Sequence, residues 1–407
     1  MIFVQIASYR DPQLIPTIND LLQKSKNPTD IKFGICWQYG PDENPDTFDG
    51  NDNFRVMKIP YSESKGLGWA RSMTNKLYGG EEYTLQIDSH HRFAPAWDEM
   101  LLDDFHQALL SSDNPIITTY CTPFEVNKVD ELHHIPCYMS QYEFSNDKLL
   151  MSRPHYIQDY LKRRHVIRAR TISAHFLFTF GHFITTVPYD PEIYFGGYTE
   201  ETTISIRAFT HGYDFFSPYR QYIWHEYTRN YRVKHWDDHR NYGDADQLSR
   251  RKTRMLLGVE KDTLSVKTSK HGLGNKRTLQ EYEAYIGIRF KECLIDPYTL
   301  DAKEPPNPNV WDVDVERRSY KIKCVWDVDL IKNNNLDEID FIALGIEDKF
   351  GECLFRVDFT KANMPQYCNF EDNEYVCELE SHKIPHKWIL WPHFATNGWG
   401  VMQEKEV

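Results

Sequence analysis

The sequence predicts an α/β protein with a mostly parallel central sheet flanked by helices, followed by a small C-terminal antiparallel β-sandwich. In the first 120 residues, short apolar runs rich in Val, Ile and Phe alternate with segments whose apolar residues recur at helical spacing. This alternation is typical of a parallel sheet with helical crossovers. Beyond the Pro-rich stretch that begins at Glu304, apolar and polar residues alternate between turn signals, as in a sandwich of antiparallel strands.

Each element of the first part follows from its own apolar pattern. The strand candidates are residues 2–7, 31–37, 54–59, 83–87 and 116–120. Helix candidates between them carry apolar residues at 14–22, 69–77 and 97–105, and a later helix around residues 204–209 follows the apolar run 172–180. In such sheets ligands bind beyond the carboxyl ends of the strands, which directs attention to residues 8–10 and 88–91.

The predicted domain organisation has three parts. Residues 1–243 form a catalytic domain, residues 244–303 form a helical extension that packs on it, and residues 304–407 form the sandwich module. The aromatic-rich last part contains Trp311, Trp326, Trp388, Trp391 and Trp399, for which core packing is the commoner role.

Composition excludes several classes of protein. The net charge of −13 opposes nonspecific binding to nucleic acid, and no stretch of the 407 residues approaches the ~20 apolar residues of a membrane span. The N-terminus lacks a basic leader and a cleavage site, which predicts a cytoplasmic protein. Eight cysteines without a Cys-x-x-Cys pair predict free buried thiols, with neither structural zinc nor a disulfide framework.

The string LQIDSHHRF carries the clearest chemical signal. An apolar strand ends at Asp88, and residues i and i+2 of an extended segment point the same way, so Asp88 and His90 can face one cation. A carboxylate with an imidazole suits manganese or zinc better than calcium. The alternative interpretation is that Asp88 caps the next helix while His90 lies on the surface.

A second candidate ligand is His225, which follows a short aromatic run in QYIWHEYTRNYR. An isolated histidine in aromatic surroundings is more often a hydrogen-bonded packing residue than a ligand. The string is not a zinc-protease motif, because His-Glu-x-x-His would require a histidine where Arg229 stands.

Two further strings suggest binding or catalysis. In YSESKGLGWAR, Gly66 allows close backbone approach at a helix start, and Lys65 and Arg71 could supply positive charge to a diphosphate; a plain loop-to-helix entry is the alternative. The third glycine of a dinucleotide fingerprint is missing. In FGGYTEET, Glu200 or Glu201 could orient a sugar or its acceptor, or both could simply complement a helix dipole.

The order and combination of these strings resemble one known family. It comprises the cytosolic N-acetylglucosaminyltransferases that modify hydroxyproline on a ubiquitin-ligase adaptor, together with their bacterial, protist and viral relatives. The strings that carry the resemblance are VQIASYRDP (4–12), KGLGWAR (65–71), EEYTLQIDSHHRF (81–93), VPYDP (187–191), FGGYTEE (195–201), THGYDFFSP (210–218) and IWHEYTRNYR (223–232). They span roughly residues 1–240 and leave the C-terminal module uncovered.

The resemblance implies a GT-A-type nucleotide-sugar transferase fold and a retaining transfer from a UDP-sugar, with N-acetylglucosamine as the expected sugar. The family is similar to the more distant polypeptide N-acetylgalactosaminyltransferases, and this likeness implies that Mn²⁺ or Mg²⁺ is held by Asp88, His90 and His225. Uridine would meet the segment formed by Ala7, Ser8, Tyr9 and Arg10, and Lys65, Gly66 and Arg71 would lie near the nucleotide with Asp88. The acceptor would be a hydroxyl of a protein or a glycan.

One departure from the family pattern bears on catalysis. Tyr198 and Thr199 separate the glycines from the acidic pair that normally follows directly, so the choice between Glu200 and Glu201 as the acceptor-side residue stays open. Two rival functions also remain. A metal-dependent phosphodiesterase or other hydrolase would need more clustered carboxylates than this sequence offers, and a glycan-binding protein would act through the C-terminal module.

Overall fold

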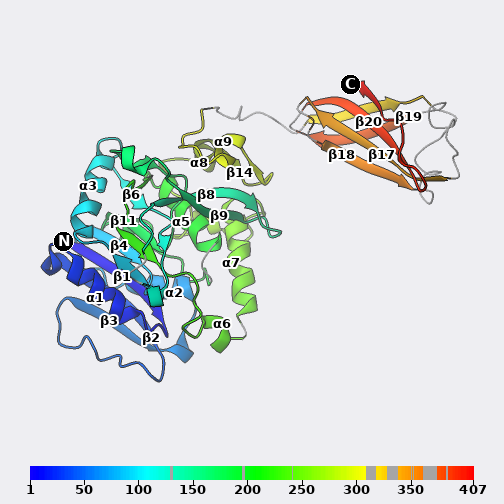
Figure 1. Ribbon diagram of the computed structural model, residues 1–407. Helices are drawn as coiled ribbons and strands as arrows, with labels where there is room; N and C mark the ends of the chain where they lie inside the picture. The colour runs from blue at the N-terminus through cyan, green and yellow to red at the C-terminus, as the bar shows by residue number, and fades with distance from the viewer. Residues whose placement is uncertain are drawn as a thin grey trace. The chain divides into compact units, whose positions relative to one another are not determined.

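The computed structural model describes residues 1–128, 132–194, 198–240, 242–308, 318–327, 338–349, 351, 353–360, 374–381 and 384–407. The chain divides into two compact units, Met1–Val310 and Trp311–Val407. The residues expected to form a helical extension, 244–303, lie within the first unit. Figure 1 shows the order of the elements along the chain.

The first unit is built on an eight-stranded sheet with the strand order β10-β12-β6-β11-β4-β1-β2-β3. The neighbours β3-β2-β1-β4 are parallel, as are β6 and β12, whereas β11 runs antiparallel between β4 and β6 and β10 runs antiparallel to β12. The strands of this sheet are β1 (Ile2–Tyr9), β2 (Ile31–Tyr39), β3 (Phe54–Pro60), β4 (Tyr83–Ile87), β6 (Pro115–Thr118), β10 (Ile167–Arg168), β11 (Phe176–Phe180) and β12 (Asp214–Ser217).

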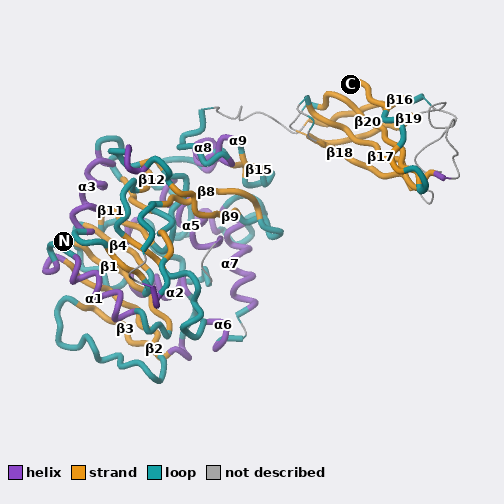
Figure 2. The backbone as a smooth tube through the Cα atoms, in the orientation of Figure 1, coloured by secondary structure: helices purple, strands orange, loops and turns teal. Residues whose placement is uncertain are grey.

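Figure 2 draws the helices of the first unit in purple. Within the described residues they are α1 (Leu14–Lys24), α2 (Leu67–Asn75), α3 (Trp97–Leu109), α4 (Phe183–Thr186), α5 (Tyr198–Thr210), α6 (His235–Asp238), α7 (Gly243–Leu256), α8 (Leu279–Ile286) and α9 (Pro297–Leu300). Of these, α2 packs against β1 and β2, and α3 packs against β6. Short 3₁₀ turns lie at Pro28–Asp30, Tyr61–Glu63, Val126–Lys128, Tyr160–Lys162 and Val266–Thr268.

Alternation along the strands divides the apolar residues between two cores. In β11, Phe176 and Phe178 join the core that also contains apolar residues of α1 and α3, whereas Leu177 joins the core shared with α5, α7 and α8. Successive strand residues point to opposite faces, so a strand buried on both sides reads as a continuous apolar run. This explains why the strands were visible in the sequence, and the predicted mostly parallel sheet flanked by helices is confirmed.

A small second sheet lies beyond the end of β4. It has the order β5-β13-β7, in which β13 (Ile223–His225) runs antiparallel to β5 (His91–Phe93) and parallel to β7 (Thr122–Pro123). The register pairs His225 with His91. A segment from far along the chain is therefore fixed directly beside the loop that leaves β4.

Two further small sheets complete the first unit. They are the hairpin of β8 (Cys137–Phe144) and β9 (Leu150–Tyr156), and the pair β14 (Ile288–Arg289) and β15 (Leu294–Ile295).

The second unit consists of two antiparallel sheets, which confirms the predicted C-terminal module. One sheet pairs β16 (Arg318–Val325) with β19 (Glu374–Ser381). The other has the order β18-β17-β20-β21, with β22 also paired to β20. Its strands are β17 (Ile339–Asp348), β18 (Cys353–Thr360), β20 (Pro385–Phe394), β21 (Gly398–Trp399) and β22 (Gln403–Glu406). Apolar residues from both sheets form one core, which includes Trp326 and Trp388, while Trp311 lies outside the described residues.

Two findings concern membranes and thiols. Across the described ranges, no helix combines the length and the apolar character that a bilayer crossing requires. The described cysteines are all unpaired: Cys36, Cys121, Cys137, Cys324 and Cys377 are buried, as expected. The expectation of buried thiols is wrong for Cys353, which is exposed on β18, and for Cys293, which is partly exposed; Cys368 lies outside the described residues.

Candidate active site

The end of β4 positions the first two candidate ligands. Asp88 is the residue directly after β4, and His90 directly precedes β5. Because β1 and β4 are parallel and Ile6 lies level with Ile87, the segment that follows β1 reaches the same edge of the sheet. The side chain of His90 is 3% exposed, and that of Asp88 is 21% exposed.

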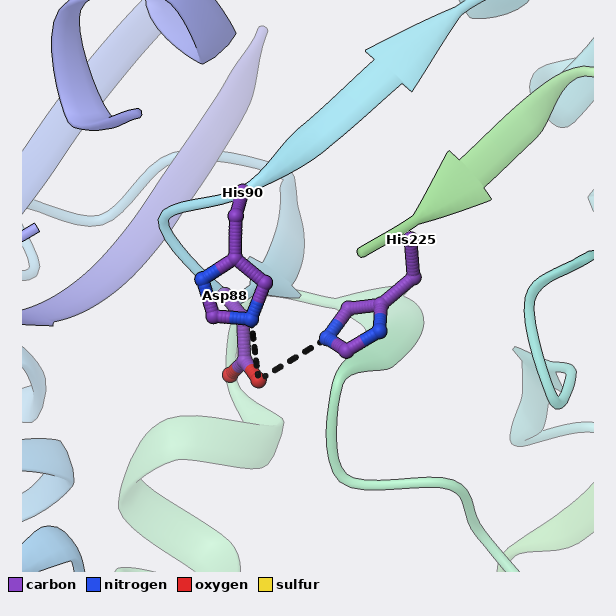
Figure 3. A group of neighbouring side chains, drawn as sticks. All are labelled: Asp88, His90 and His225. Atoms are coloured by element: carbon purple, nitrogen blue, oxygen red, sulfur yellow. Dashed lines mark hydrogen bonds and ion pairs between the residues drawn. The ribbon is translucent and has the colours of Figure 1, made fainter. Parts of the chain in front are cut away.

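The antiparallel pairing of β5 and β13 brings His225 to the same point. His225 Nε2 lies 3.3 Å from Asp88 Oδ2, although the two residues are 137 positions apart. His90 Nε2 lies 3.8 Å from the same oxygen. One ligand atom from each of the three residues lies within 4.8 Å of the others, and both imidazoles point toward the carboxylate (Figure 3).

The polar contacts of His90 fit the binding of a divalent cation. Its Nδ1 lies 2.7 Å from Oδ2 of the fully buried Asp11, so in the neutral ring Nδ1 carries the hydrogen and donates a hydrogen bond to the carboxylate. Nε2 then bears the lone pair, and within the described part of the chain this buried atom has no hydrogen-bond partner. A histidine held by a carboxylate through one nitrogen and free at the other is the usual form of a metal ligand.

The electrostatics of the cluster favour the same protonation state. Burial alone would raise the pKa of Asp88, but the Arg71 guanidinium and the neighbouring histidines hold it well below its ordinary value. Burial lowers the pKa of His225 well below 6.5. An ionised carboxylate beside a neutral imidazole is the state that a cation requires of its ligands.

A cavity of about 490 Å³ opens in front of the cluster. The predicted site residues that line it are Ala7, Tyr9, Gly66, Arg71, Asp88, His90, Glu200, Glu201 and His225. Gly66 has a φ of 97°, and a Cβ there would lie 2.5 Å from the carbonyl oxygen of Tyr194, so this position requires glycine.

Ser8, Arg10 and Lys65 stand outside the lining of this cavity. Ser8 is fully buried, Lys65 is exposed, and Arg10 forms an ion pair of 2.8 Å with Asp238. The Arg10 guanidinium also lies over the ring of Tyr61, 4.6 Å from its centroid. Arg10 is therefore held at the rim, beside the Tyr9 ring that faces the cavity.

Arg71 is 1% exposed and its guanidinium contacts protein groups on several sides. It donates to Asp88 Oδ1 at 2.6 Å and to Glu200 Oε1 at 3.2 Å, and also to the backbone oxygens of Ile87 and Ala174. A buried cation is stable only when it is paired and hydrogen-bonded, and these contacts meet that condition. The geometry favours a role for Arg71 in holding the Asp88 carboxylate.

The two glutamates of α5 have different surroundings. Glu200 is 3% exposed and pairs with Arg71, whereas Glu201 Oε1 accepts a hydrogen bond of 3.3 Å from the backbone N–H of Ala174. Burial, followed by the nearby charge of Glu200, raises the pKa of Glu201 to about 8. Near neutral pH Glu201 can therefore exchange a proton, a property expected of a group that assists a reacting hydroxyl.

Asp11, His175 and His235 are among the residues of this site that were not predicted from the sequence. Asp11 orients His90, and it follows β1 at the edge where ligands were expected, so a signal for it existed. His175 lines the cavity with its ring centroid 4.5 Å from that of His225, but it lies inside an apolar run that offered no signal. The ring of His235 in α6 lies 4.8 Å from that of Tyr9 in a tilted arrangement, and no local pattern marks it.

A cavity at the carboxyl edge of a mostly parallel sheet, lined by a candidate cation-binding cluster, is typical of an α/β enzyme. Comparison with known families makes the class specific. The family model described as Glycosyltransferase (GlcNAc) matches residues 1–50 and 46–292, which is more than half of the chain. The chain therefore belongs to this glycosyltransferase family, and the predicted enzyme class is confirmed.

Solved structures that match the chain share little sequence with it. GalNAc-T7 with UDP, GalNAc and Mn²⁺ is 13% identical with a TM-score of 0.42, and the match covers 74% of this chain and 56% of that one. S. aureus TarS 1–349 in complex with UDP-GlcNAc is 12% identical with a TM-score of 0.39, and the match covers 70% of each chain. The chain thus spans little more than half of the GalNAc-T7 chain. A search of curated proteins found no match.

Proposed function

We propose that this glycosyltransferase moves N-acetylglucosamine from UDP-GlcNAc to a hydroxyl of a protein or a glycan, with retention at the anomeric carbon. The observation that carries the proposal is the convergence of Asp88, His90 and His225 at the mouth of the cavity. The name of the matched family supports the choice of sugar. The resemblance to the hydroxyproline-modifying enzymes supports hydroxyproline, serine or threonine as the acceptor residue.

Asp88, His90 and His225 would hold Mn²⁺ or Mg²⁺. When bound, the cation supplies positive charge that stabilises the departing diphosphate. Asp11 fixes the ring of His90 through Nδ1, and Arg71 fixes the carboxylate of Asp88 through a hydrogen bond of 2.6 Å. The protein thereby presents the ligand atoms in place before the donor arrives.

Of the other predicted residues, Ala7 and Tyr9 line the cavity and would contact the uridine, and Gly66 and Arg71 line it and would lie near the diphosphate. Ser8, Arg10 and Lys65 lie outside the lining and would support the nucleotide site from its surroundings. Glu201 would orient the acceptor hydroxyl, since Glu200 is already paired with Arg71. The hydroxyl would attack from the side of the leaving group, with its proton passing to the departing diphosphate oxygen.

The test is a transfer assay with purified full-length chain, Mn²⁺, several UDP-sugars and a panel of hydroxyproline, serine and glycan acceptors, read by mass spectrometry. We expect Asp88→Ala, His90→Ala and His225→Ala each to lower transfer by about a hundredfold or more, because each removes a ligand. The exposed His165→Ala serves as the matched control.

Melting temperatures with UDP and Mn²⁺, singly and together, give a second readout. Because ligands that bind only the native state raise the melting temperature, the UDP shift should require Mn²⁺ in the wild type and vanish in His225→Ala. Donor cleavage to free sugar at the same rate with and without acceptor would instead identify a hydrolase. Full transfer by His225→Ala would remove the proposed cation site.

A further inference from the structure

The outer face of the five-stranded sheet in the second unit carries an unexpected set of side chains. Along β17, Ile342 and Leu344 point into the core between the two sheets, so Phe341 and Ala343 point outward. Along β20, Leu390 belongs to the core and its neighbour Trp391 points outward. The outward face of a sandwich sheet normally carries polar residues, because it meets water.

Four aromatic rings lie next to one another on this face. Phe341 pairs across the strands with His393, and their rings are stacked with centroids 5.0 Å apart. His393 pairs in turn with Trp399 at 5.1 Å, and Trp399 lies against Trp391 at 4.6 Å. We call Phe341, Trp391, His393 and Trp399 the aromatic platform. Its strands β17 and β20 run side by side in Figure 2.

The two tryptophans of the platform are exposed, Phe341 and His393 are partly buried, and the rings have well-defined contacts. Trp391 is 37% exposed and Trp399 is 45% exposed. The indole N–H of Trp391 donates a hydrogen bond of 2.9 Å to the carbonyl oxygen of Gly400, and Trp399 packs between Trp391 and His393. Rings that are already ordered lose little side-chain freedom when a ligand binds, so the platform is organised for binding.

The residues beside the platform offer space and hydrogen-bonding groups. Ala343 lies in register with Trp391, and Gly345 follows on the same face. A Cβ on Gly345 would meet only the carbonyl oxygen of Phe355, at 3.8 Å, so the surface above it is open. On β18, Arg356 and Asp358 lie in register with these two small residues and form an ion pair of 3.0 Å.

We propose that the aromatic platform binds carbohydrate. On one face of many pyranose rings several C–H groups point in the same direction. This face is apolar and carries partial positive charge, so it stacks on the negative face of an indole ring. Its hydroxyls can then bond to a carboxylate and a guanidinium at the edge, such as those of Asp358 and Arg356. A protein partner would gain less from this mixture of small exposed residues and an exposed ion pair.

Carbohydrate is also the occupant that the rest of the chain favours, because the first unit belongs to a family of sugar transferases. The platform would hold a glycan that carries, or lies near, the acceptor. It lies outside the residues that the family model matches. The proposed binding is separate from the transfer step, since no residue of the platform lines the cavity of the first unit.

The test measures binding of three soluble hexasaccharides, chitohexaose, cellohexaose and maltohexaose, to the full chain by isothermal titration calorimetry in EDTA. We expect at least one of them to bind with a Kd below about 1 mM. Trp391→Ala and Trp399→Ala should each weaken that binding by about tenfold, and Trp399→Phe should retain most of it, because a phenyl ring still offers an aromatic face. Val376→Ala, an exposed apolar residue of the other sheet, is the matched control.

Two further measurements separate this inference from its alternatives. Asp88→Ala should bind the hexasaccharide like the wild type, so loss of transfer and loss of glycan binding are distinguishable. Failure of all three sugars to bind, or unchanged binding by the double variant Trp391→Ala/Trp399→Ala, would overturn the proposal. A dimer in light scattering that the double variant converts to monomer would also overturn it, because the platform would then serve self-association.

Discussion

The carboxylate of Asp11 decides how His90 is presented. It is buried and accepts a hydrogen bond from His90 Nδ1, and its Oδ2 also accepts one of 2.7 Å from Ser89. A carboxylate behind a ligating imidazole fixes the ring and raises the basicity of the other nitrogen. Asp11 therefore acts on the proposed cation through His90.

We expect Asp11→Asn to weaken Mn²⁺ binding by roughly tenfold to a hundredfold, the effect usual for an outer partner of a metal ligand. The amide can still hold the ring but no longer carries the negative charge. Calorimetric titration of Mn²⁺ into the chain, with the exposed Asp30→Asn as control, measures the effect. Equal affinity in the two variants would show that His90 needs no support from Asp11.

Glu200 and Glu201 should respond differently to the same substitution. Glu200→Gln removes the charge that pairs with the buried Arg71, so we expect a loss of about 1–3 kcal/mol in the free energy of unfolding. Glu201→Gln should raise stability at pH 7 rather than lower it, because glutamine keeps the shape of the neutral glutamic acid but does not ionise in the unfolded chain; it should also lower kcat. Chemical denaturation and initial rates measured for both variants test this difference. A Glu200→Gln variant that is more stable than Glu201→Gln would contradict it.

The pH dependence of stability provides a further test of Glu201. Burial raises the pKa of Glu201 from 4.5 to about 8, so the folded chain keeps a proton that the unfolded chain loses between those values. Stability should therefore fall as pH rises from about 4.5 to 8 and level off above it. This fall should be smaller in Glu201→Gln, as measured by denaturation at pH 5, 6, 7 and 8 without added metal; parallel curves for the two proteins would contradict it.

At the scale of elements, the sequence showed where the parallel strands β1 to β4 lie along the chain. It did not show which strand pairs with β4 on its other side, or in which direction that strand runs. Residues 2–7, 31–37 and 83–87 are rich in apolar residues because these strands, β1, β2 and β4, are buried on both faces. Residues 54–59 correspond to the edge strand β3, which is only partly buried and carries Arg55 and Lys58. The run 172–180 was recognised as apolar, yet its local pattern could not show that β11 lies antiparallel between β4 and β6. Strand order and direction are set by long-range packing.

The candidate site divides in the same way. Asp88 and His90 were predictable because both belong to one strand end, where side chains alternate. The position of His225 depends on the pairing of β13 with β5, which no local pattern specifies; only the resemblance to a family suggested it. The surroundings of Arg71 were also out of reach, because its partners Asp88, Ala174 and Glu200 come from three separate segments.

The short helix α6 supports the side of the cavity that Tyr9 lines. Its Asp238 accepts a hydrogen bond of 2.7 Å from the hydroxyl of Tyr9 and forms an ion pair with Arg10, and the ring of its His235 packs against the Tyr9 ring in a tilted arrangement. One carboxylate thereby fixes two neighbouring residues at the end of β1. If Tyr9 contacts uridine, α6 determines how well that contact is organised.

We expect Asp238→Asn to weaken UDP binding by roughly threefold to tenfold, which corresponds to about one charge-assisted hydrogen bond at a partly exposed site. Mn²⁺ affinity measured without UDP should not change, because Asp238 does not contact the candidate ligands. Calorimetry with each ligand separates the two effects, and Asp30→Asn again serves as the control. A loss of Mn²⁺ affinity instead would mean that α6 supports the cation site.

At the scale of the whole molecule, the chain contains two units with separate apolar cores. The two cores of the first unit contain only residues between Ile2 and Ile295, and the core of the second unit contains only residues between Tyr320 and Phe394. Hydrophobic burial is the main contribution to folding stability, so each unit is stabilised by its own apolar core. The family match ends at residue 292, within the first unit.

The end of the first unit can be located more closely from one buried cation. Arg170 is 4% exposed, and its guanidinium donates to the backbone oxygen of Ile286 at 3.0 Å and to Asn307 Oδ1 at 2.8 Å. Asn307 also donates to Thr299 Oγ1 at 3.1 Å. Asn307 lies beyond residue 304, the position at which the Pro-rich composition predicted the C-terminal module to begin, yet its contacts are with the first unit. The segment 304–308 therefore contributes to the first unit.

A chain truncated to residues 1–310 should keep the melting temperature of the first unit and full transfer to a small acceptor. A chain truncated to residues 1–303 lacks Asn307 and leaves part of the Arg170 guanidinium buried without a partner, which should cost about 2–3 kcal/mol. The expected result is a melting temperature several degrees lower for the shorter chain. Asn307→Ala within residues 1–310 should reproduce most of this loss. Equal melting temperatures for the two truncated chains would place the boundary at residue 304 after all, and would mean that the Arg170 to Asn307 contact contributes little to folding.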